Sequence, residues 1–328
     1  MLILFCLIFL SYSLTFENWV NRYNKQFTTA ELLRRRAIYV DNLNYVVEHS
    51  GINGVQLSLD GPYATLTNEE YKSLLRLQSV SPNTQSKKKT VDYQDDDVPT
   101  SFDLRNYNHK NYVNTPGDQG NCGSCYSFAI TAYLDTNMLL NYDEYTVNSF
   151  RLSTAEIISC ANNNYKDCHG CDGGSLSCGL QYVKNKGLCL EEQFKFCGKD
   201  NNCPSANNLP ERATEIDGIE SASFSMDLEG HKRIIYKHGG SLTAMDSSRM
   251  SYQLYAGGIY QDSRCSQIAL NHAVNIVGYG VENYIPYFIV KNSYGSNWGE
   301  MGYIRVRADN NMCGLSTNVY WVDKVKKA

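Results

Sequence analysis

The stretch QGNCGSCYSFA, residues 119–129, places two cysteines three positions apart where a glycine-rich turn gives way to helix-forming residues. Apolar residues then recur through YSFAITAYLDTNMLLN at the frequency of a long, mostly buried helix, so we expect Cys125 in its first turn. Cys122 and Cys125 could therefore be a redox couple, half of a zinc site, two structural thiols, or a nucleophile beside a disulfide-bonded cysteine. The rest of the chain decides among these roles.

The cysteine content favours disulfides. The chain has 12 cysteines in 328 residues, and Cys6 falls in an apolar N-terminal run. The odd number that remains predicts, in an oxidising compartment, five disulfides and one free thiol. A thiol left over from a disulfide framework is a candidate nucleophile.

Composition and the N-terminus narrow the class of protein. Hydrophobic residues make up 42% of the chain, as in an ordinary globular protein, and the net charge of -4 argues against a nucleic-acid partner. The run MLILFCLIFL is too short to span a bilayer and fits the apolar part of a secretory signal, residues 1–13. No later segment is apolar enough for a membrane helix. We therefore expect entry into the secretory pathway, with a lysosome-like vesicle or the extracellular space as the destination.

The N-terminal third reads as a helical leader and a linker. Five residues of the charged, helix-patterned stretch after Phe16 share one helix face, namely Glu31, Arg35, Tyr39, Asn42 and Val46. Further on, Thr67 and Glu70 have the spacing of a capping box. The polar, proline-bearing residues 79–101 cannot bury enough surface to pack. This organisation is typical of a zymogen, in which residues 14–97 would be a leader and a linker that is cleaved near residues 86–98. Two ordinary domains with a flexible joint are the alternative.

In the body, residues 98–328, the residue pattern changes from helical to β-rich along the chain. Helical patterning dominates to about residue 219. From about residue 220, β-rich runs such as HAVNIVGYG, YFIVKNSYG and GYIRVRA alternate with glycine-rich turns. We predict an α+β body with a helical half and a β half.

Four residues together can carry nucleophilic chemistry. A cysteine attacks as thiolate, and both a helix N-terminus and a neighbouring imidazolium lower its pKa. Cys125 lies at an expected helix N-terminus, and His272 in LNHAVNIVGYG can supply the imidazolium. Asn292 in VKNSYGSNWGE can orient the imidazole, and Gln119 can donate to the oxyanion beside the backbone N–H of Cys125. The other five histidines lack such support.

These segments resemble the papain-like cysteine peptidases. QGNCGSC, NHAVNIVGYG and NSYGSNWGEMGYIRV are similar to that family's nucleophile, histidine and asparagine segments, in the same order, and the leader resembles its inhibitory propeptide at Glu31, Arg35 and Asn42. The resemblance covers nearly the whole chain and implies the papain-like two-lobed α+β fold, with a helical lobe, a β-barrel-like lobe and a cleft between them. It implies Cys125 as nucleophile, His272 as general base and acid, Asn292 as orienter and Gln119 as oxyanion donor. No metal or cofactor is implied.

The resemblance also implies a peptide-binding cleft. The segment GCDGGSL would lie along the bound peptide. The implied substrate-binding residues are Gly173, Gly174, Ser175, Leu176, Ala244, Leu270, Asn271, Ala273, Tyr294, Trp298 and Asn318. The subsite for the second residue before the cut has uncharged walls and Asn318 at its floor, so we predict apolar residues there over Arg. The implied partners are polypeptide substrates, the chain's own propeptide and cystatin-like inhibitors, and an endopeptidase is favoured over an exopeptidase.

The resemblance further implies three disulfides: Cys122 with Cys171, Cys160 with Cys203, and Cys265 with Cys313. Cys168, Cys178, Cys189 and Cys197 are additional, and we expect two more bonds among them in a pairing that the sequence leaves open.

The chain departs from the family pattern at several positions. Tyr126 and Tyr294 stand where the family usually has Trp, and we expect Tyr294 to shield the bond between His272 and Asn292 less well. In the leader, Thr65 occupies the place of an Asp, which puts in doubt an acid trigger acting through that residue.

Two other functions stay open at this point. A thiol–disulfide oxidoreductase would use Cys122 as the attacking thiol, and a disulfide-rich binding protein on the same fold would be catalytically silent. A zinc site would need a second C-x-x-C about 15–20 residues on, whereas the pair at Cys168 and Cys171 comes 42 residues later.

Overall fold

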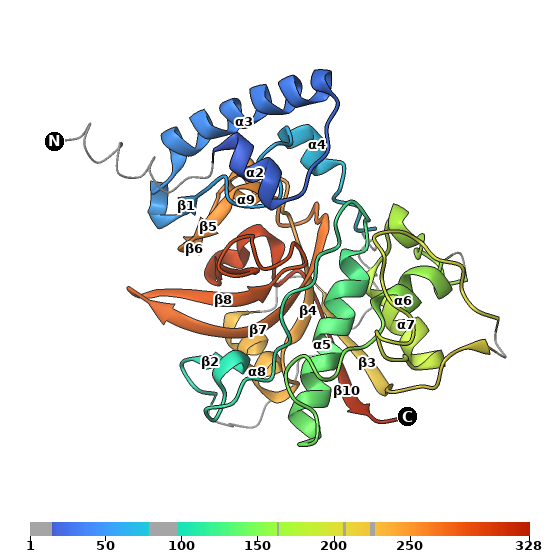
Figure 1. The fold of residues 1–328 in the computed structure, drawn as a ribbon. Coiled ribbons are helices and arrows are strands. Elements are labelled where there is room, and N and C mark those ends of the chain that lie inside the picture. The colour runs from blue at the N-terminus through green and yellow to red at the C-terminus, as the bar shows by residue number, and fades with distance from the viewer. Residues whose placement is uncertain (1–14, 79–97, 163, 206–207, 224–226) are drawn as a thin grey trace.

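The computed structural model describes residues 15–78, 98–162, 164–205, 208–223 and 227–328. The signal expected at residues 1–13 and the cleavage region expected near residues 86–98, apart from Val98, lie outside these residues. Figure 1 shows the N-terminal helices, in blue, lying across one end of a body that consists of helices on one side and strands on the other. In the described part of the chain, no helix has both the length and the apolar content needed to cross a bilayer.

The leader contains helices α2 (Phe16–Arg22), α3 (Thr29–His49) and α4 (Asn68–Lys72). The face predicted for α3 is confirmed: Tyr39 and Asn42 are buried, and Asn42 donates through Nδ2 to the carbonyls of Ala64 and Leu66. The capping box predicted for Thr67 and Glu70 is also present at the start of α4. These contacts fold the chain after α3 back along the helix.

The leader attaches to the body through a strand and a small core. Strand β1 (Gln56–Leu57) pairs antiparallel with β5 (Tyr255–Gly257) of the β lobe. The leader's core residues Trp19, Tyr39 and Leu59 form one cluster with Leu254 of the body. Leader and body are therefore joined by both backbone pairing and apolar packing.

The helical lobe consists of α5 (Cys125–Asn141), α6 (Thr154–Cys160) and α7 (Leu176–Lys186). Twelve of the seventeen residues of α5 are buried, which confirms the expectation of a mostly buried helix that begins at Cys125. In Figure 1, α5 runs through the body, with α6 and α7 on one side and β7 (His272–Glu282) and β8 (Ile285–Lys291) of the sheet on the other.

The β lobe is built on an eight-stranded sheet. Its order is β3 (Glu215–Ser223), β10 (Asn318–Lys326), β4 (Ser241–Met245), β7 (His272–Glu282), β8 (Ile285–Lys291), β9 (Tyr303–Arg307) and β6 (Ile259–Tyr260), and β2 (Phe102–Asp103) adds to β7. The path runs from β3 to β6, and no pairing between these two end strands is found among the described residues. The sheet is therefore open instead of a closed barrel. Helices α8 (Leu228–Lys237) and α9 (Met250–Gln253) complete the lobe.

The cores of the two lobes do not divide at one point in the sequence. Phe102 and Leu104, which precede the helical lobe, pack in the β-lobe cluster with Val274. Trp321 and Val325 on the last strand pack in the helical-lobe cluster with Leu134. Each lobe therefore receives a segment from the opposite end of the body, which ties the lobes together.

The disulfides agree in part with expectation. The three implied bonds form, and a fourth joins Cys168 to Cys178. The expected fifth bond is wrong: the thiols of Cys189 and Cys197 are free, as is that of Cys125. Cys189 is buried and Cys197 is exposed, so these two cysteines lie in different environments and do not pair. An odd count therefore did not identify a single free thiol.

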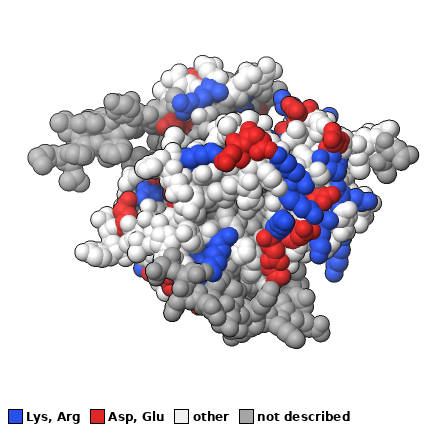
Figure 2. All heavy atoms as spheres, turned by 90° about the horizontal axis from the view of Figure 1, so that it is seen from below, with Lys and Arg blue, Asp and Glu red and all other residues white. Residues whose placement is uncertain are grey.

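Charged side chains of both signs share the surface. On the face drawn in Figure 2, Lys and Arg lie interspersed with Asp and Glu. This face has no broad field of one sign, in keeping with the small net charge of -4.

Trp19 should contribute strongly to stability, because it is fully buried and its Nε1–H donates to the carbonyl of Gly61 at 2.9 Å. Trp19→Ala should lower the free energy of unfolding of the full chain by about 3–5 kcal/mol. Urea unfolding followed by far-UV circular dichroism measures this loss. Leu33→Ala is the control, since Leu33 is 66% exposed on α3 and should change the value by less than about 0.5 kcal/mol. Equal midpoints for the two variants would contradict this assignment.

Candidate active site

Cys125 is the first residue of α5 and lies at the boundary between the lobes. Its side chain is 1% exposed. The preceding loop is held by the bond between Cys122 and Cys171 and by the N–H of Gly123, which donates to the carbonyl of Cys171. The disulfide therefore fixes the turn from which the helix starts.

His272 begins β7 and faces the start of α5 from the other lobe. The N–H of Ala273, the next residue, lies 3.4 Å from Sγ of Cys125 and donates to it. The imidazole Nε2 lies 2.7 Å from Oδ1 of Asn292, which accepts its hydrogen. Nδ1 is buried and has no hydrogen-bond partner. The ring is thus held in one tautomer, and its second nitrogen is left for another group.

A backbone pairing across the lobes aligns Gln119 with Asn292. Asp118 forms an antiparallel bridge with Tyr294, and the N–H of Gln119 donates to the carbonyl of Ser293 at 2.9 Å. The hydroxyl of Ser293 donates to Oε1 of Gln119 at 2.5 Å, and Nε2 of Gln119 donates to the carbonyl of Cys122 at 2.9 Å. The amide is therefore held with its nitrogen toward the turn that precedes Cys125. The structure brings together all four residues predicted for catalysis.

Burial keeps the central pair neutral in this structure. It raises the pKa of Cys125 to about 11, although the N–H groups of Ala273 and of the first helical turn oppose this. Burial also lowers the pKa of His272 to about 4, and the hydrogen bond to Asn292 opposes this in turn. A depressed cysteine pKa was expected, but with the leader in place it is raised.

The leader runs through the region where the peptide-binding residues were predicted. The N–H of Leu77 donates to the carbonyl of Asn271 at 3.3 Å, and the N–H of Gln78 donates to the carbonyl of Gly174 at 3.0 Å. Leu77 and Gly174 form a parallel bridge. The leader therefore forms hydrogen bonds with backbone carbonyls of both lobes, at Asn271 and Gly174.

Gly173 and Gly174 are glycines for separate reasons. Gly173 has φ of +118°, and a Cβ there would lie 2.0 Å from the carbonyl oxygen of Arg76. A Cβ on Gly174 would lie 2.6 Å from the ring of Tyr126. Because neither glycine has a side chain, the leader can approach closely at Gly173, and the ring of Tyr126 can pack against Gly174.

Three of the other predicted pocket residues form a row across strands. Ala244 pairs with Ala273 between β4 and β7, and the register of β10 with β4 extends to place Asn318 opposite Ala244. Leu176 and Ala273 lie in the same core cluster, against which Leu77 of the leader packs. Ser175 caps α7, and Leu270 is buried two residues before His272.

Tyr294, which stands where the family usually has Trp, packs against His272. Tyr294 stacks on His272 with ring centroids 5.0 Å apart and an interplanar angle of 29°. Trp298 contacts Tyr294 edge-on at 5.4 Å and is fully buried. Tyr294 is 3% exposed, so the tyrosine ring covers the imidazole in this structure.

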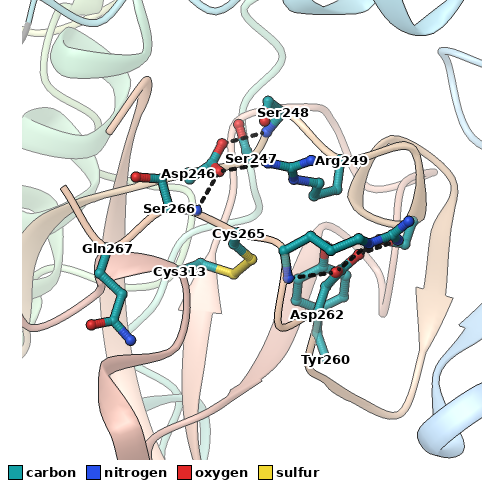
Figure 3. The surroundings of a disulfide bond; sticks show 12 residues. Asp246, Ser247, Ser248, Arg249, Tyr260, Asp262, Cys265, Ser266, Gln267 and Cys313 are labelled. Atoms are coloured by element: carbon teal, nitrogen blue, oxygen red, sulfur yellow. Dashed lines mark hydrogen bonds and ion pairs between the residues drawn. A yellow bond between two sulfur atoms is a disulfide. The ribbon is translucent and has the colours of Figure 1, made fainter. Parts of the chain in front are cut away.

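Asp246, which was not predicted from the sequence, supports the start of β7. Its carboxylate accepts from the N–H groups of Ser248 and Ser266 and from Nδ2 of Asn271, at 2.7–3.0 Å. Figure 3 shows it beside the bond between Cys265 and Cys313. These hydrogen bonds lower its pKa even though burial opposes them. Asp246 therefore positions Asn271, whose carbonyl accepts a hydrogen bond from the leader. In the sequence, the run Asp-Ser-Ser after a β-rich segment was the available signal, because an Asp side chain favours a turn by accepting from the backbone two residues on.

A buried pair of charges lies behind the site. A cavity of about 240 Å³ is lined by Asp135 of α5 and by Lys291, the residue before Asn292. Both side chains are 4% exposed. Burial raises the pKa of Asp135 and lowers that of Lys291, while their attraction opposes both shifts. Asp135 on the helix of Cys125 and Lys291 on the strand that ends before Asn292 therefore face the same cavity.

The disulfides bear on the alternative functions. Cys122 is bonded to Cys171 and not to Cys125, so the two cysteines of the C-x-x-C are not a redox couple in this structure. A thiol–disulfide oxidoreductase with Cys122 as the attacking thiol is therefore disfavoured.

Comparison with known proteins agrees with this geometry. Residues 98–322 match the family described as Papain family cysteine protease, and residues 16–71 match the Cathepsin propeptide inhibitor domain (I29). The chain is 34% identical over 316 residues to Cysteine proteinase 1 of Entamoeba histolytica, covering 95% of each chain. It is 31% identical to a Cathepsin L-like proteinase of Fasciola hepatica, covering 92% of this chain and 90% of that one.

A solved structure shows the same arrangement of leader and body. Digestive procathepsin L 3 of Tenebrio molitor superposes with a TM-score of 0.80 at 25% identity, covering 93% of this chain and 97% of the other. The chain therefore belongs to the papain family of cysteine proteases and carries a cathepsin-type propeptide inhibitor domain in front of its protease domain.

Proposed function

We propose that the processed protein is an endopeptidase that cleaves peptide bonds through an acyl-enzyme on Cys125. The observation that carries this proposal is the contact across the lobes, where the N–H of Ala273 meets Sγ of Cys125 and the adjacent imidazole is held by Asn292. His272 Nδ1, which lacks a partner, takes the thiol proton, and the thiolate attacks the peptide carbonyl.

The remaining steps follow from the same groups. The attack moves the carbonyl electrons onto oxygen, and this oxyanion takes hydrogen bonds from the backbone N–H of Cys125 and from Nε2 of Gln119. Collapse of the intermediate breaks the C–N bond, and His272 gives its proton to the leaving amine. Water then attacks the thioester with His272 as base, which releases the acid and regenerates the thiol.

The leader, residues 14–97, acts as the inhibitor of this site. Its backbone bonds to Asn271 and Gly174 take the partners that a substrate needs, and its cover keeps the thiol and imidazole neutral. Cleavage near residues 86–98, in the polar linker, frees a protease domain of residues 98–328. The parallel bridge to Gly174 supports this arrangement, because an antiparallel substrate would run the opposite way through the cleft.

The enzyme acts in the secretory pathway, in a lysosome-like vesicle or outside the cell. Four disulfides, a secretory signal at residues 1–13 and a zymogen leader support this location. Polypeptides are its substrates, and cystatin-like inhibitors that fill an open cleft are further partners.

Alkylation across pH tests the nucleophile. Only the thiolate reacts, so Cys125 with a pKa of about 11 should react negligibly at pH 7 in the zymogen, with about one thiol in ten thousand ionised. After processing, it should react with iodoacetamide below the ~8.5 pKa of a free cysteine. Mass spectrometry of each cysteine at pH 5–11 measures both.

The thiol of Cys197 is the internal control, because it is exposed and should be modified to the same extent in both forms. Loss of peptidase activity should parallel the modification of Cys125. Full activity after complete alkylation of Cys125 would refute the proposed nucleophile.

Ser293 should assist by orienting Gln119. Ser293→Ala removes the hydrogen bond to Oε1, so the oxyanion donor is less well placed and kcat should fall about 2- to 10-fold with little change in KM. Ser296→Ala, at an exposed position of the same loop, is the matched control and should behave as wild type. Steady-state kinetics on a peptide substrate measure both, and an unchanged kcat for Ser293→Ala would remove this role.

The pocket formed by the row of Ala244, Ala273 and Asn318 should prefer apolar residues at the second position before the cut. It contains no carboxylate to pair with Arg, and burying an unpaired charge is costly. A peptide library should show Leu or Val ahead of Arg by at least about tenfold in kcat/KM. Introducing a carboxylate by Asn318→Asp should raise the rate with Arg selectively, and a clear Arg preference in the wild type would contradict this pocket.

A further inference from the structure

The hydroxyl of Tyr294 is engaged by the leader. Tyr71 of α4 donates from its hydroxyl to the carbonyl of Ser247 at 3.0 Å, and the same hydroxyl lies 3.2 Å from that of Tyr294. Tyr71 has one hydroxyl hydrogen and gives it to Ser247, so Tyr294 is the donor in the second bond. Tyr71 is fully buried and Tyr294 is 3% exposed, so both bonds are made away from water.

The protease domain therefore offers one donor and one acceptor at this point. The donor is the O–H of Tyr294, and the acceptor is the carbonyl of Ser247. A hydroxyl, which both donates and accepts, complements this pair, whereas a carboxylate only accepts and an ammonium only donates. A phenyl ring satisfies neither group. We call the pair of groups the hydroxyl niche.

Aromatic rings on the protease domain shape the niche for a ring. Tyr71 meets Tyr294 edge-on, with centroids 6.3 Å apart and an interplanar angle of 86°. Trp298 and Tyr252 also pack edge-on against Tyr294, at 5.4 and 6.5 Å, and stay with the protease domain when the leader departs. The niche thus presents a polar pair within an aromatic wall, which suits a phenol in both shape and polarity.

The niche lies on the leaving-group side of the cleft. Tyr294 stacks on His272, which in the proposed function gives its proton to the leaving amine. The leader's contact with Gly174 is made about six residues further along the chain, at Leu77 and Gln78. Tyr71 and Leu77 therefore mark two separate parts of the cleft, one beside the imidazole and one beside the glycine pair.

We propose that the processed enzyme uses the hydroxyl niche to recognise tyrosine on the C-terminal side of the scissile bond. In the zymogen Tyr71 fills the niche, and its departure leaves the O–H of Tyr294 and the carbonyl of Ser247 to a substrate. A tyrosine restores both hydrogen bonds. A phenylalanine of the same shape covers the two groups and leaves them unpaired, which disfavours it. The inference rests on the proposed function, because His272 defines the leaving-group side.

Matched peptides that differ only by Tyr or Phe test the niche. They carry the substitution at the first or the second position after the cut and are compared by kcat/KM in the wild type and in Tyr294→Phe. The wild type should favour Tyr about tenfold at one of the two positions. Tyr294→Phe keeps the ring and removes the donor, so the ratio should fall toward one. Because the result is a ratio within each enzyme, a general change in activity cancels.

The zymogen gives a second, independent measurement of the same hydrogen bonds. Tyr71→Phe, Tyr294→Phe and the double variant, each with Cys125→Ser to prevent self-processing, form a double-mutant cycle on urea unfolding. The two hydroxyls should be coupled, so the double variant should lose less than the sum of the single variants. Tyr63→Phe is the matched control: its ring meets Tyr294 edge-on at 4.8 Å, and it should be additive with Tyr294→Phe.

The outcomes separate this inference from the proposed function. Equal rates for Tyr and Phe peptides in an enzyme whose hydrolysis depends on Cys125, or a Tyr preference that persists in Tyr294→Phe, would overturn the niche alone. Hydrolysis that survives the loss of Cys125 would overturn the proposed function and the niche with it. Additive effects of Tyr71→Phe and Tyr294→Phe would also count against the niche.

Discussion

The approach of strand β7 to the first turn of α5 is the constraint on which the rest of this structure depends. One strand and one helix, from different lobes, begin at the two residues that must meet, His272 and Cys125. The N–H of Ala273 on Sγ joins them directly. The pairing of residues 117–119 with 293–295 holds the same lobes together beside this contact.

The leader makes the site inert by both steric and electrostatic means. Its chain fills the backbone partners at Gly174 and Asn271, and in this leader-bound structure burial favours the neutral forms of the Cys125 thiol and the His272 imidazole. In the same structure Tyr71 of the leader meets Tyr294, and their two hydroxyls are satisfied away from water. Replacing the usual tryptophan by tyrosine therefore does more than change how well the imidazole is covered. It introduces a hydroxyl whose partner is Tyr71 of the leader.

Several features could be read from local patterns, and several could not. The capping box at Thr67, the buried face of α3 and the start of α5 at Cys125 each depend on residues close in sequence, and all three are confirmed. The disulfide count was wrong because Cys189 is buried and Cys197 is exposed, and the burial of a side chain depends on distant segments. Asp246 was missed for the same reason: its importance comes from Ser266 and Asn271, which are about twenty or more residues away.

The sequence by itself determined the order of the segments that resemble the papain-like peptidases, the candidates for the nucleophile and its partners, and the division into a leader and a body. These follow from residue type and spacing, which are local properties of the chain. Only the tertiary structure decided which thiols pair, that Cys125 and His272 are neutral beneath the leader, and that the hydroxyls of Tyr71 and Tyr294 meet. Each of these depends on distance, burial and dielectric environment between segments far apart in the chain, and those quantities exist only once the lobes and the leader have packed together.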